Sequence, residues 1–224
     1  MKVTEEIYYF PGINFDSNVF LIKDNQSSEL TVIDCGSGFF FDRLIKSISR
    51  DGLNHENITQ IILTHVHFDH SGGLINFVRK YDPKVLVFHL EADSIEKGGN
   101  GLLLAKQFGL EFTPTKVHQR IKEGEIIKAG NLNLRVLNTP GHTIGSICLY
   151  DEDKRVLFSG DTVFSQGSFG RVDFPTGDPK QMVQSLLRLS KLNVEYLLCG
   201  HLNIVTENAN EQIKLSLKNA RLFL

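Results

Sequence analysis

The sequence has no tryptophan, only three cysteines and no apolar run long enough to cross a membrane. An odd number of cysteines, each in an apolar and strand-like context, favours buried free thiols over a disulfide framework. The first residues lack the apolar core of a signal peptide. These absences argue against a secreted, disulfide-stabilised protein, and we expect a cytoplasmic one.

The sequence also lacks an excess of charge of either sign. Its formal net charge is −2, and lysines and glutamates alternate instead of forming a like-charge block. We therefore expect neither nucleic acid nor a membrane surface as a partner. The 224 residues, 41% of them hydrophobic, suit one globular domain over positions 1–224. A small-molecule substrate is the partner to expect, and a homo-oligomer is left open.

Three histidines and an aspartate are concentrated directly after one apolar run. Residues 61–63 read as a buried strand, and His65, His67, Asp69 and His70 follow it. A glycine pair then marks a sharp change of direction. A strand end can hold imidazoles and a carboxylate on a rigid edge, as a metal site requires. Zinc and its first-row neighbours prefer these ligands.

Further candidate ligands lie in three short segments later in the chain. His142, Asp161 and His201 each follow an apolar, strand-like run and have a glycine beside them. One potential ligand at the end of each of several strands is how a sheet gathers a site from distant parts of a sequence. Together with the first cluster they make five imidazoles and two carboxylates. This set suits two metals, with Asp161 able to bridge them.

The order of these residues resembles the metallo-β-lactamase superfamily over nearly the whole chain. The resemblance implies an α/β fold, the four-layer αββα sandwich, with the metals at one edge between two sheets. It implies one metal held by His65, His67 and His142, a second held by Asp69, His70 and His201, and Asp161 bridging them. Asp34 matches the superfamily's first motif, an acid that supports the site without binding metal. The alternative for Asp34 is a turn acid before Gly36.

The apolar pattern and the turn residues predict the elements of both halves of the chain. Strands are expected over residues 3–10, 19–23, 30–33, 61–64, 85–88, 125–128, 132–137, 146–150, 155–158 and 195–198. Helices are expected over residues 40–50, 74–80, 91–96, 179–189 and 208–223, the fourth capped by Asp178 with Pro179 in its first turn. Residues 98–114 are either a lid or a surface excursion. The irregular segment 165–178 follows Asp161 directly and should lie beside the metals.

The chemistry expected of such a site is hydrolysis of an ester-like bond. Two divalent metals sharing a carboxylate lower the pKa of a bridging water, which leaves a hydroxide at neutral pH. Asp69 is the candidate catalytic residue, because its second oxygen could accept a hydrogen bond from the hydroxide and pass the proton on. Zinc is the expected metal, and iron and manganese are the alternatives.

Within the superfamily, the glyoxalase II (hydroxyacylglutathione hydrolase) group is similar in the block 160–164 and in Gly170-Arg171. This resemblance implies a thioester substrate and a substrate contact by Arg171. The alternative for Arg171 is an ion pair with Asp173 or Asp178. Two departures put the thiol carrier in doubt: the chain ends soon after His201, without the group's helical domain, and Leu202 stands where the group has a tyrosine.

Two other reactions stay open. A persulfide (sulfur) dioxygenase on the same scaffold would use one iron, and that family also has a Gly-Arg-x-Asp segment like residues 170–173. A lactonase is less compatible with the sequence, because that group commonly has alanine where Thr162 follows the bridging aspartate. The reading that we develop is a metal-dependent hydrolase acting on a thioester or a related ester.

Overall fold

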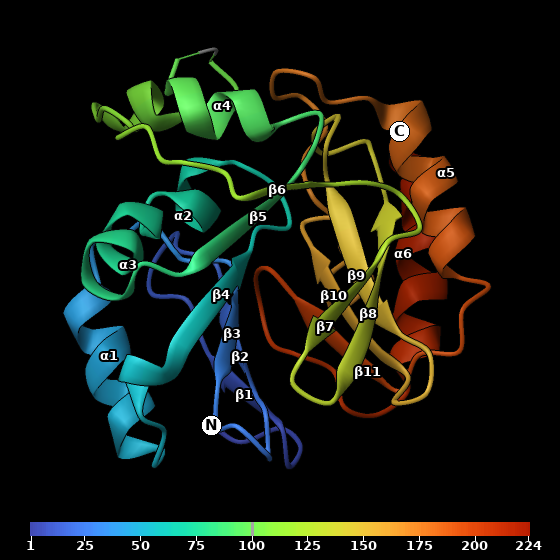
Figure 1. The fold of residues 1–224 in the computed structure, drawn as a ribbon. Helices are drawn as coiled ribbons and strands as arrows, with labels where there is room; N and C mark the ends of the chain where they lie inside the picture. The colour runs from blue at the N-terminus through green and yellow to red at the C-terminus, as the bar shows by residue number, and fades with distance from the viewer. Residues whose placement is uncertain (100) are drawn as a thin grey trace. The chain divides into compact units, whose positions relative to one another are not determined.

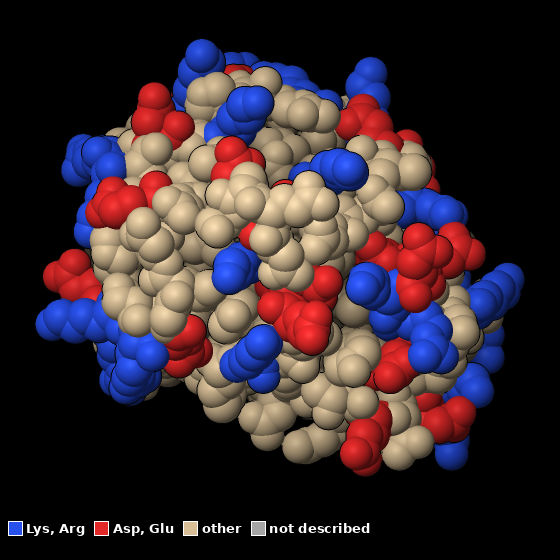
Figure 2. Space-filling view, turned by 60° about the horizontal axis from the view of Figure 1, so that its bottom comes forward, with Lys and Arg blue, Asp and Glu red and all other residues tan. Residues whose placement is uncertain are grey.

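The computed structural model describes residues 1–99 and 101–224, and the chain divides into two compact units. The first unit comprises Met1–Arg120 with Lys128–Asn131, and the second comprises Ile121–Ile127 with Leu132–Leu224. None of the described helices combines the length and the apolar composition that a membrane crossing requires. On the face drawn in Figure 2, Lys and Arg side chains are interspersed with Asp and Glu, in keeping with the small net charge.

The first sheet runs in sequence order from β1 to β6. Its strands are β1 (Ile7–Phe10), β2 (Val19–Lys23), β3 (Leu30–Ile33), β4 (Ile58–Ile62), β5 (Lys84–Phe88) and β6 (Gln119–Ile121). The pairs β1–β2 and β2–β3 are antiparallel, whereas β3–β4 and β4–β5 are parallel. Parallel strands end at the same edge of a sheet. The residues that follow β3 and β4 therefore meet there.

Helices cover one face of this first sheet (Figure 1). They are α1 (Phe41–Arg50), α2 (Phe68–Ser71), α3 (Leu74–Tyr81) and α4 (Ala92–Lys97). The first unit also contains the short 3₁₀ helices η1 (His55–Asn57) and η2 (Ala105–Phe108). Ile45 and Ile48 of α1 and Phe77 of α3 join the buried side chains of β2 to β5 in one hydrophobic cluster. Burial of these apolar faces is what holds the helices on the sheet.

The second sheet has the strand order β11-β10-β9-β8-β7. Its strands are β7 (Ile126–Ala129), β8 (Leu132–Asn138), β9 (Ile147–Asp151), β10 (Val156–Gly160) and β11 (Tyr196–Cys199). The pairs β8–β9 and β9–β10 are antiparallel, and β10–β11 is parallel. Helices α5 (Pro179–Leu189) and α6 (Ala209–Phe223) lie together on one side of this sheet (Figure 1), where Leu186, Ile213 and Leu217 contribute to a second cluster.

Each predicted helix and strand has a counterpart, and the differences lie mostly at the ends. The first strand begins at Ile7, not at residue 3. Helix α5 has the predicted bounds, and the side chain of Asp178 accepts hydrogen bonds from the amides of Lys180 and Gln181, which confirms the predicted cap. The three cysteines are free and buried, as predicted.

Four short elements were not predicted: α2, β6, η1 and η2. Helix η2 lies within the segment 98–114, of which Asn100 is outside the described residues. The segment 165–178 has neither helix nor strand, as expected.

Candidate metal centre

The first unit places one group of candidate ligands directly after β4. His67 is the N-cap of α2, and Asp69 and His70 lie within that helix. The imidazole of His65 is 4.8 Å from that of His67 and 4.1 Å from that of His70, measured between ring centroids. Nε2 of His70 is 3.7 Å from Oδ2 of Asp69. All three rings are buried, whereas Asp69 is partly exposed.

Asp34 connects the end of β3 to this group. Its Oδ1 accepts a hydrogen bond from the backbone N–H of Thr64 at 2.8 Å. Its Oδ2 accepts one from the Thr64 hydroxyl at 2.7 Å and lies 2.8 Å from Nδ1 of His70. Because a carboxylate only accepts, the His70 contact places the proton on Nδ1 and leaves Nε2 as the ring atom that could bind a metal.

Thr64 extends the same effect to His65. The Thr64 hydroxyl has one proton, which it donates to Asp34. It can therefore only accept from Nδ1 of His65, which lies 3.2 Å away. His65 is then also protonated on Nδ1 and presents Nε2 as its ligand atom. A single buried carboxylate thus sets the tautomers of two histidines, one of them through a hydroxyl.

Backbone packing also fixes α2. The N–H of Cys35 donates to the carbonyl of His70 at 2.7 Å, and the N–H of Ser17 donates to that of Asp69 at 3.1 Å. A Cβ added to Gly73 would lie 2.2 Å from the carbonyl oxygen of Cys35. Only glycine permits so close an approach between the two backbones. This accounts physically for the glycine pair that follows the histidines.

Buried Glu91 is a further support, which the sequence analysis missed. Its Oε2 accepts a hydrogen bond from the N–H of Val66 at 3.0 Å. Val66 lies between His65 and His67, so this bond restrains the loop that carries both rings. Nothing in the local sequence marks Glu91, since an acid at the start of a short helix is common there for its interaction with the helix dipole alone.

The second unit gathers the remaining candidate ligands around one carboxylate. Oδ2 of Asp161 is 3.6 Å from Nε2 of His142 and 3.5 Å from Nε2 of His201. Asp161 and His142 are buried, and His201 is partly exposed. The three residues follow β10, β8 and β11, so the second sheet does bring these strand ends together.

The segment 165–178 packs against these ligands. Nδ1 of His142 donates to the backbone carbonyl of Arg171 at 2.6 Å, which directs Nε2 of His142 toward Asp161. A Cβ added to Gly170 would lie 2.0 Å from the carbonyl oxygen of Asp161 and 3.0 Å from Nδ1 of His142. Glycine is therefore required at position 170 for this approach.

The side chain of Arg171 makes the ion pair that the sequence analysis gave as its alternative. Nε and Nη2 contact the two carboxylate oxygens of Asp173 at 2.9 and 2.6 Å. The guanidinium also lies over the ring of Phe174, 4.3 Å from its centroid. The Arg171 side chain is 66% exposed. A substrate contact by this side chain stays a prediction.

The cysteines near the ligands have no features of a nucleophile. Burial raises the pKa of the Cys199 thiol to about 12 and that of the Cys148 thiol to about 11. The Cys199 thiol donates to the carbonyl of Asn203 at 3.3 Å. The remaining histidines have other contacts; His118, for example, accepts a hydrogen bond from the N–H of Val85. The chemistry expected here is that of imidazoles and carboxylates.

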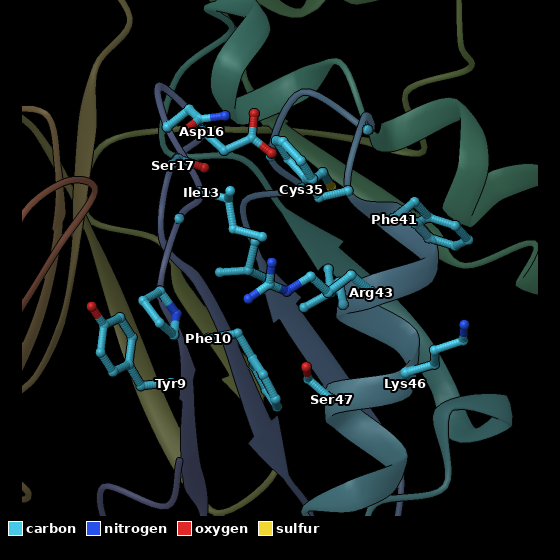
Figure 3. A pocket seen from close by; sticks show the side chains of 18 of the residues that line it. Tyr9, Phe10, Ile13, Asp16, Ser17, Cys35, Phe41, Arg43, Lys46 and Ser47 are labelled. Carbon is cyan, nitrogen blue, oxygen red and sulfur yellow. The ribbon is translucent and has the colours of Figure 1, made fainter.

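A cavity of about 810 Å³ lies in the first unit, between α1 and the loop that joins β1 to β2 (Figure 3). Its lining includes Phe10, Ile13 and the cationic side chain of Arg43. Asp16 and Ser17 line its end beside α2. Burial raises the pKa of the Asp16 carboxyl, against hydrogen bonds from Ser37 that lower it. Asp16 was not among the site residues predicted from the sequence.

The donor set fits divalent metal ions in both units. Buried imidazoles present Nε2, because their Nδ1 atoms bond to a carboxylate, a hydroxyl or a carbonyl. Outer contacts of this kind orient metal-binding histidines and raise their basicity. Nitrogen and oxygen donors without thiolate suit zinc, iron and manganese.

Comparisons with known proteins agree on one class. The family model of the metallo-beta-lactamase superfamily matches residues 12–201, so the chain belongs to this superfamily. The acyl-coenzyme A thioesterase MBLAC2 of Bos taurus is 32% identical over 89% of this chain and 77% of its own length. The hydroxyacylglutathione hydrolase of Rhodopseudomonas palustris (strain HaA2) is 33% identical over 92% of this chain and 70% of its own.

A solved structure supports the same fold. The crystal structure of TTHA1623 in a di-iron-bound form is 29% identical to this chain in sequence, with a TM-score of 0.73. The match covers 95% of this chain and 96% of the TTHA1623 chain. The predicted family and fold class, an α/β metallo-β-lactamase fold, are therefore confirmed.

Proposed function

We propose that this chain is a metal-dependent hydrolase whose two groups of ligands together hold two divalent ions. One observation carries the proposal: the family model extends over residues 12–201 and so includes every candidate ligand from both units. The proposed ligands are His65, His67 and His142 for one ion, Asp69, His70 and His201 for the other, with Asp161 between them. Both units would then act as a single domain over residues 1–224.

The residues of this chain supply orientation and proton transfer. Ions held at the centre would activate water as the nucleophile and polarise the substrate carbonyl. Asp34 and Thr64 hold His70 and His65 with Nε2 presented. Partly exposed Asp69 can bind through one oxygen and accept a proton at the other, and it is the proposed catalytic residue. Zinc is the proposed metal, with iron or manganese as the alternatives.

The substrate that we propose is a thioester. Two relatives at about one-third identity are named for hydrolysis of thioesters, one of coenzyme A and one of glutathione. Their names support the reaction class and leave the thiol carrier open. The persulfide dioxygenase and lactonase readings remain as alternatives. The small-molecule partner, the cytoplasmic location and an oligomer likewise stay predictions.

A matched pair of variants tests the mechanism. We expect Asp161→Ala to lower kcat/KM on thioesters by about 100-fold or more, because it removes the carboxylate on which His142 and His201 converge. Cys199→Ala removes a buried thiol shortly before His201 in the sequence, and this variant should retain most of the activity. Assays with acetyl-coenzyme A and lactoylglutathione after reloading with zinc, iron or manganese provide the measurement.

The same assays, extended to glutathione persulfide and to lactones, distinguish the three proposed reactions. Loss of activity in Cys199→Ala, with the fold intact, would replace the metal mechanism by a thiol mechanism. Consumption of oxygen with glutathione persulfide, by protein containing a single iron, would favour the dioxygenase. Turnover of lactones without thioesters would favour the lactonase.

A further inference from the structure

Four phenylalanines form a connected cluster in the first unit. Phe15 lies in the loop between β1 and β2, Phe39 precedes α1, Phe68 begins α2 and Phe108 ends η2. The rings of Phe15 and Phe108 stack with centroids 4.8 Å apart and planes 16° apart. Phe39 is 6.1 Å from Phe15 and also 6.1 Å from Phe68. Phe68 is 6.1 Å from Phe108, which closes the cluster.

Three of these phenylalanines are substantially exposed to water. The exposed fractions are 37% for Phe15, 55% for Phe39 and 45% for Phe108, whereas Phe68 is only 6% exposed. Clustered exposure of large apolar rings is costly in water and in many proteins marks a binding surface. If the rings served only to anchor η2, they would gain most from being buried. Their exposed areas are therefore available to a ligand.

The position of the cluster connects it to the candidate metal centre. Phe68 lies between His67 and Asp69, two of the proposed ligands. Two residues after Phe15, the N–H of Ser17 donates to the backbone carbonyl of Asp69. An apolar group attached to a carbonyl held at the ligands would thus have aromatic rings within reach.

We propose that Phe15, Phe39, Phe68 and Phe108 form the binding surface for an apolar acyl chain of the thioester substrate. This inference rests on the proposed function and narrows it, because it assigns the specificity to a fatty-acyl group and not to a short polar one. Aromatic faces bind a flexible alkyl chain through dispersion and through removal of apolar area from water. Each fully buried methylene would contribute about fourfold to kcat/KM.

The first test compares acyl chain lengths. Acetyl-, hexanoyl- and decanoyl-coenzyme A are assayed with the unmodified protein and with Phe39→Ala, Phe108→Ala and the double variant. We expect kcat/KM to rise with chain length, and the ratio of decanoyl to acetyl turnover to fall by about tenfold or more in the double variant. Phe223→Ala, which removes an exposed ring of α6 in the second unit, is the control and should keep the ratio.

A binding experiment separates this inference from the proposed function. Calorimetry with the non-hydrolysable thioethers S-decyl- and S-methyl-coenzyme A needs no turnover. Tighter binding of the decyl compound, lost in Phe39→Ala/Phe108→Ala and kept in Phe223→Ala, would support the acyl surface even if no thioester is hydrolysed. Equal or absent binding of the two thioethers by the unmodified protein would overturn it. So would a preference that the double variant retains, or a cluster that binds phosphatidylcholine vesicles and not the thioether.

Discussion

At the scale of single residues, the proposed ligands are oriented by groups that are not themselves proposed to bind metal. Asp34 bonds to the backbone and hydroxyl of Thr64 and to His70, and Thr64 in turn bonds to His65. Asp34 also has a backbone φ of 59°, in the left-handed region that most residues avoid. The left-handed backbone and the buried carboxylate of Asp34 both lower the stability of the folded state. This loss of stability has a functional explanation if Asp34 orients two of the proposed ligands.

The role of Asp34 predicts the effect of replacing it by asparagine. Asp34→Asn should weaken metal binding by about 10- to 100-fold, because the amide nitrogen cannot accept a hydrogen bond and the charge beside His70 is lost. Competitive titration of apo-protein with zinc against a chromophoric chelator measures the change. Asp24→Asn is the control, since Asp24 also accepts backbone hydrogen bonds in the first unit but is partly exposed, directly before an exposed turn. Equal zinc affinity in both variants would remove Asp34 from the site.

At the scale of elements, strand ends and the helices behind them are joined by polar side chains as well as by the core. Glu123, in the turn before β7, contacts Arg188 of α5 at 2.5 Å. Glu123 also accepts from the N–H of Asn138 at 2.5 Å, and Arg188 donates to the Asn138 carbonyl at 3.1 Å. Asn138 ends β8, a few residues before His142. This network therefore fixes α5 against the strand that leads to His142, a proposed ligand.

The pH dependence of stability follows from the same network. Burial would raise the pKa of Glu123, but its pairing with Arg188 and the Asn138 amide outweigh burial and lower it. A lowered pKa contributes stability above the unfolded-state pKa, and that stability is lost as the pH falls through the folded-state value. Glu123→Gln should thus lower the free energy of unfolding at pH 7, by less than about 1 kcal/mol since the pair is partly exposed, and lower Tm accordingly. The difference from the unmodified protein should vanish in acid.

Thermal unfolding at pH 7 and near pH 3 provides the measurement. Glu152→Gln is the matched control, because Glu152 pairs with Arg135 at 2.7 Å on the surface of the same unit with both side chains more exposed. A Tm difference for Glu123→Gln that stays constant with pH would show that charge pairing is not its cause.

At the scale of the whole molecule, the sequence allowed most of the elements and the grouping of candidate ligands at strand ends to be predicted, but not the contacts that orient those candidate ligands. Helix α5 was predictable because Asp178 and Pro179 mark its start. Helix α2 was not, since four residues are too few for a helical period to appear. The carbonyl of Arg171 and the carboxylate of Glu91 act through folded geometry. A sequence does not show which backbone carbonyl will accept a hydrogen bond from a histidine, and a single acidic residue gives only a weak signal of such a role.

The proposed metal centre makes a final prediction about stability. Ions bound to the native state and not to the unfolded chain stabilise by about 2.7 kcal/mol when the free ion is at about 100 times its Kd. Removing metal with a chelator should therefore lower Tm by roughly 5–10 °C for a chain of this length, and added zinc should restore it. Because the proposed ligands come from both compact units, probes in each unit should report the same shift. Asp161→Ala should unfold at one temperature with and without zinc, whereas Cys199→Ala should keep the zinc dependence. A chelator-independent Tm in the unmodified protein would contradict the shared metal centre.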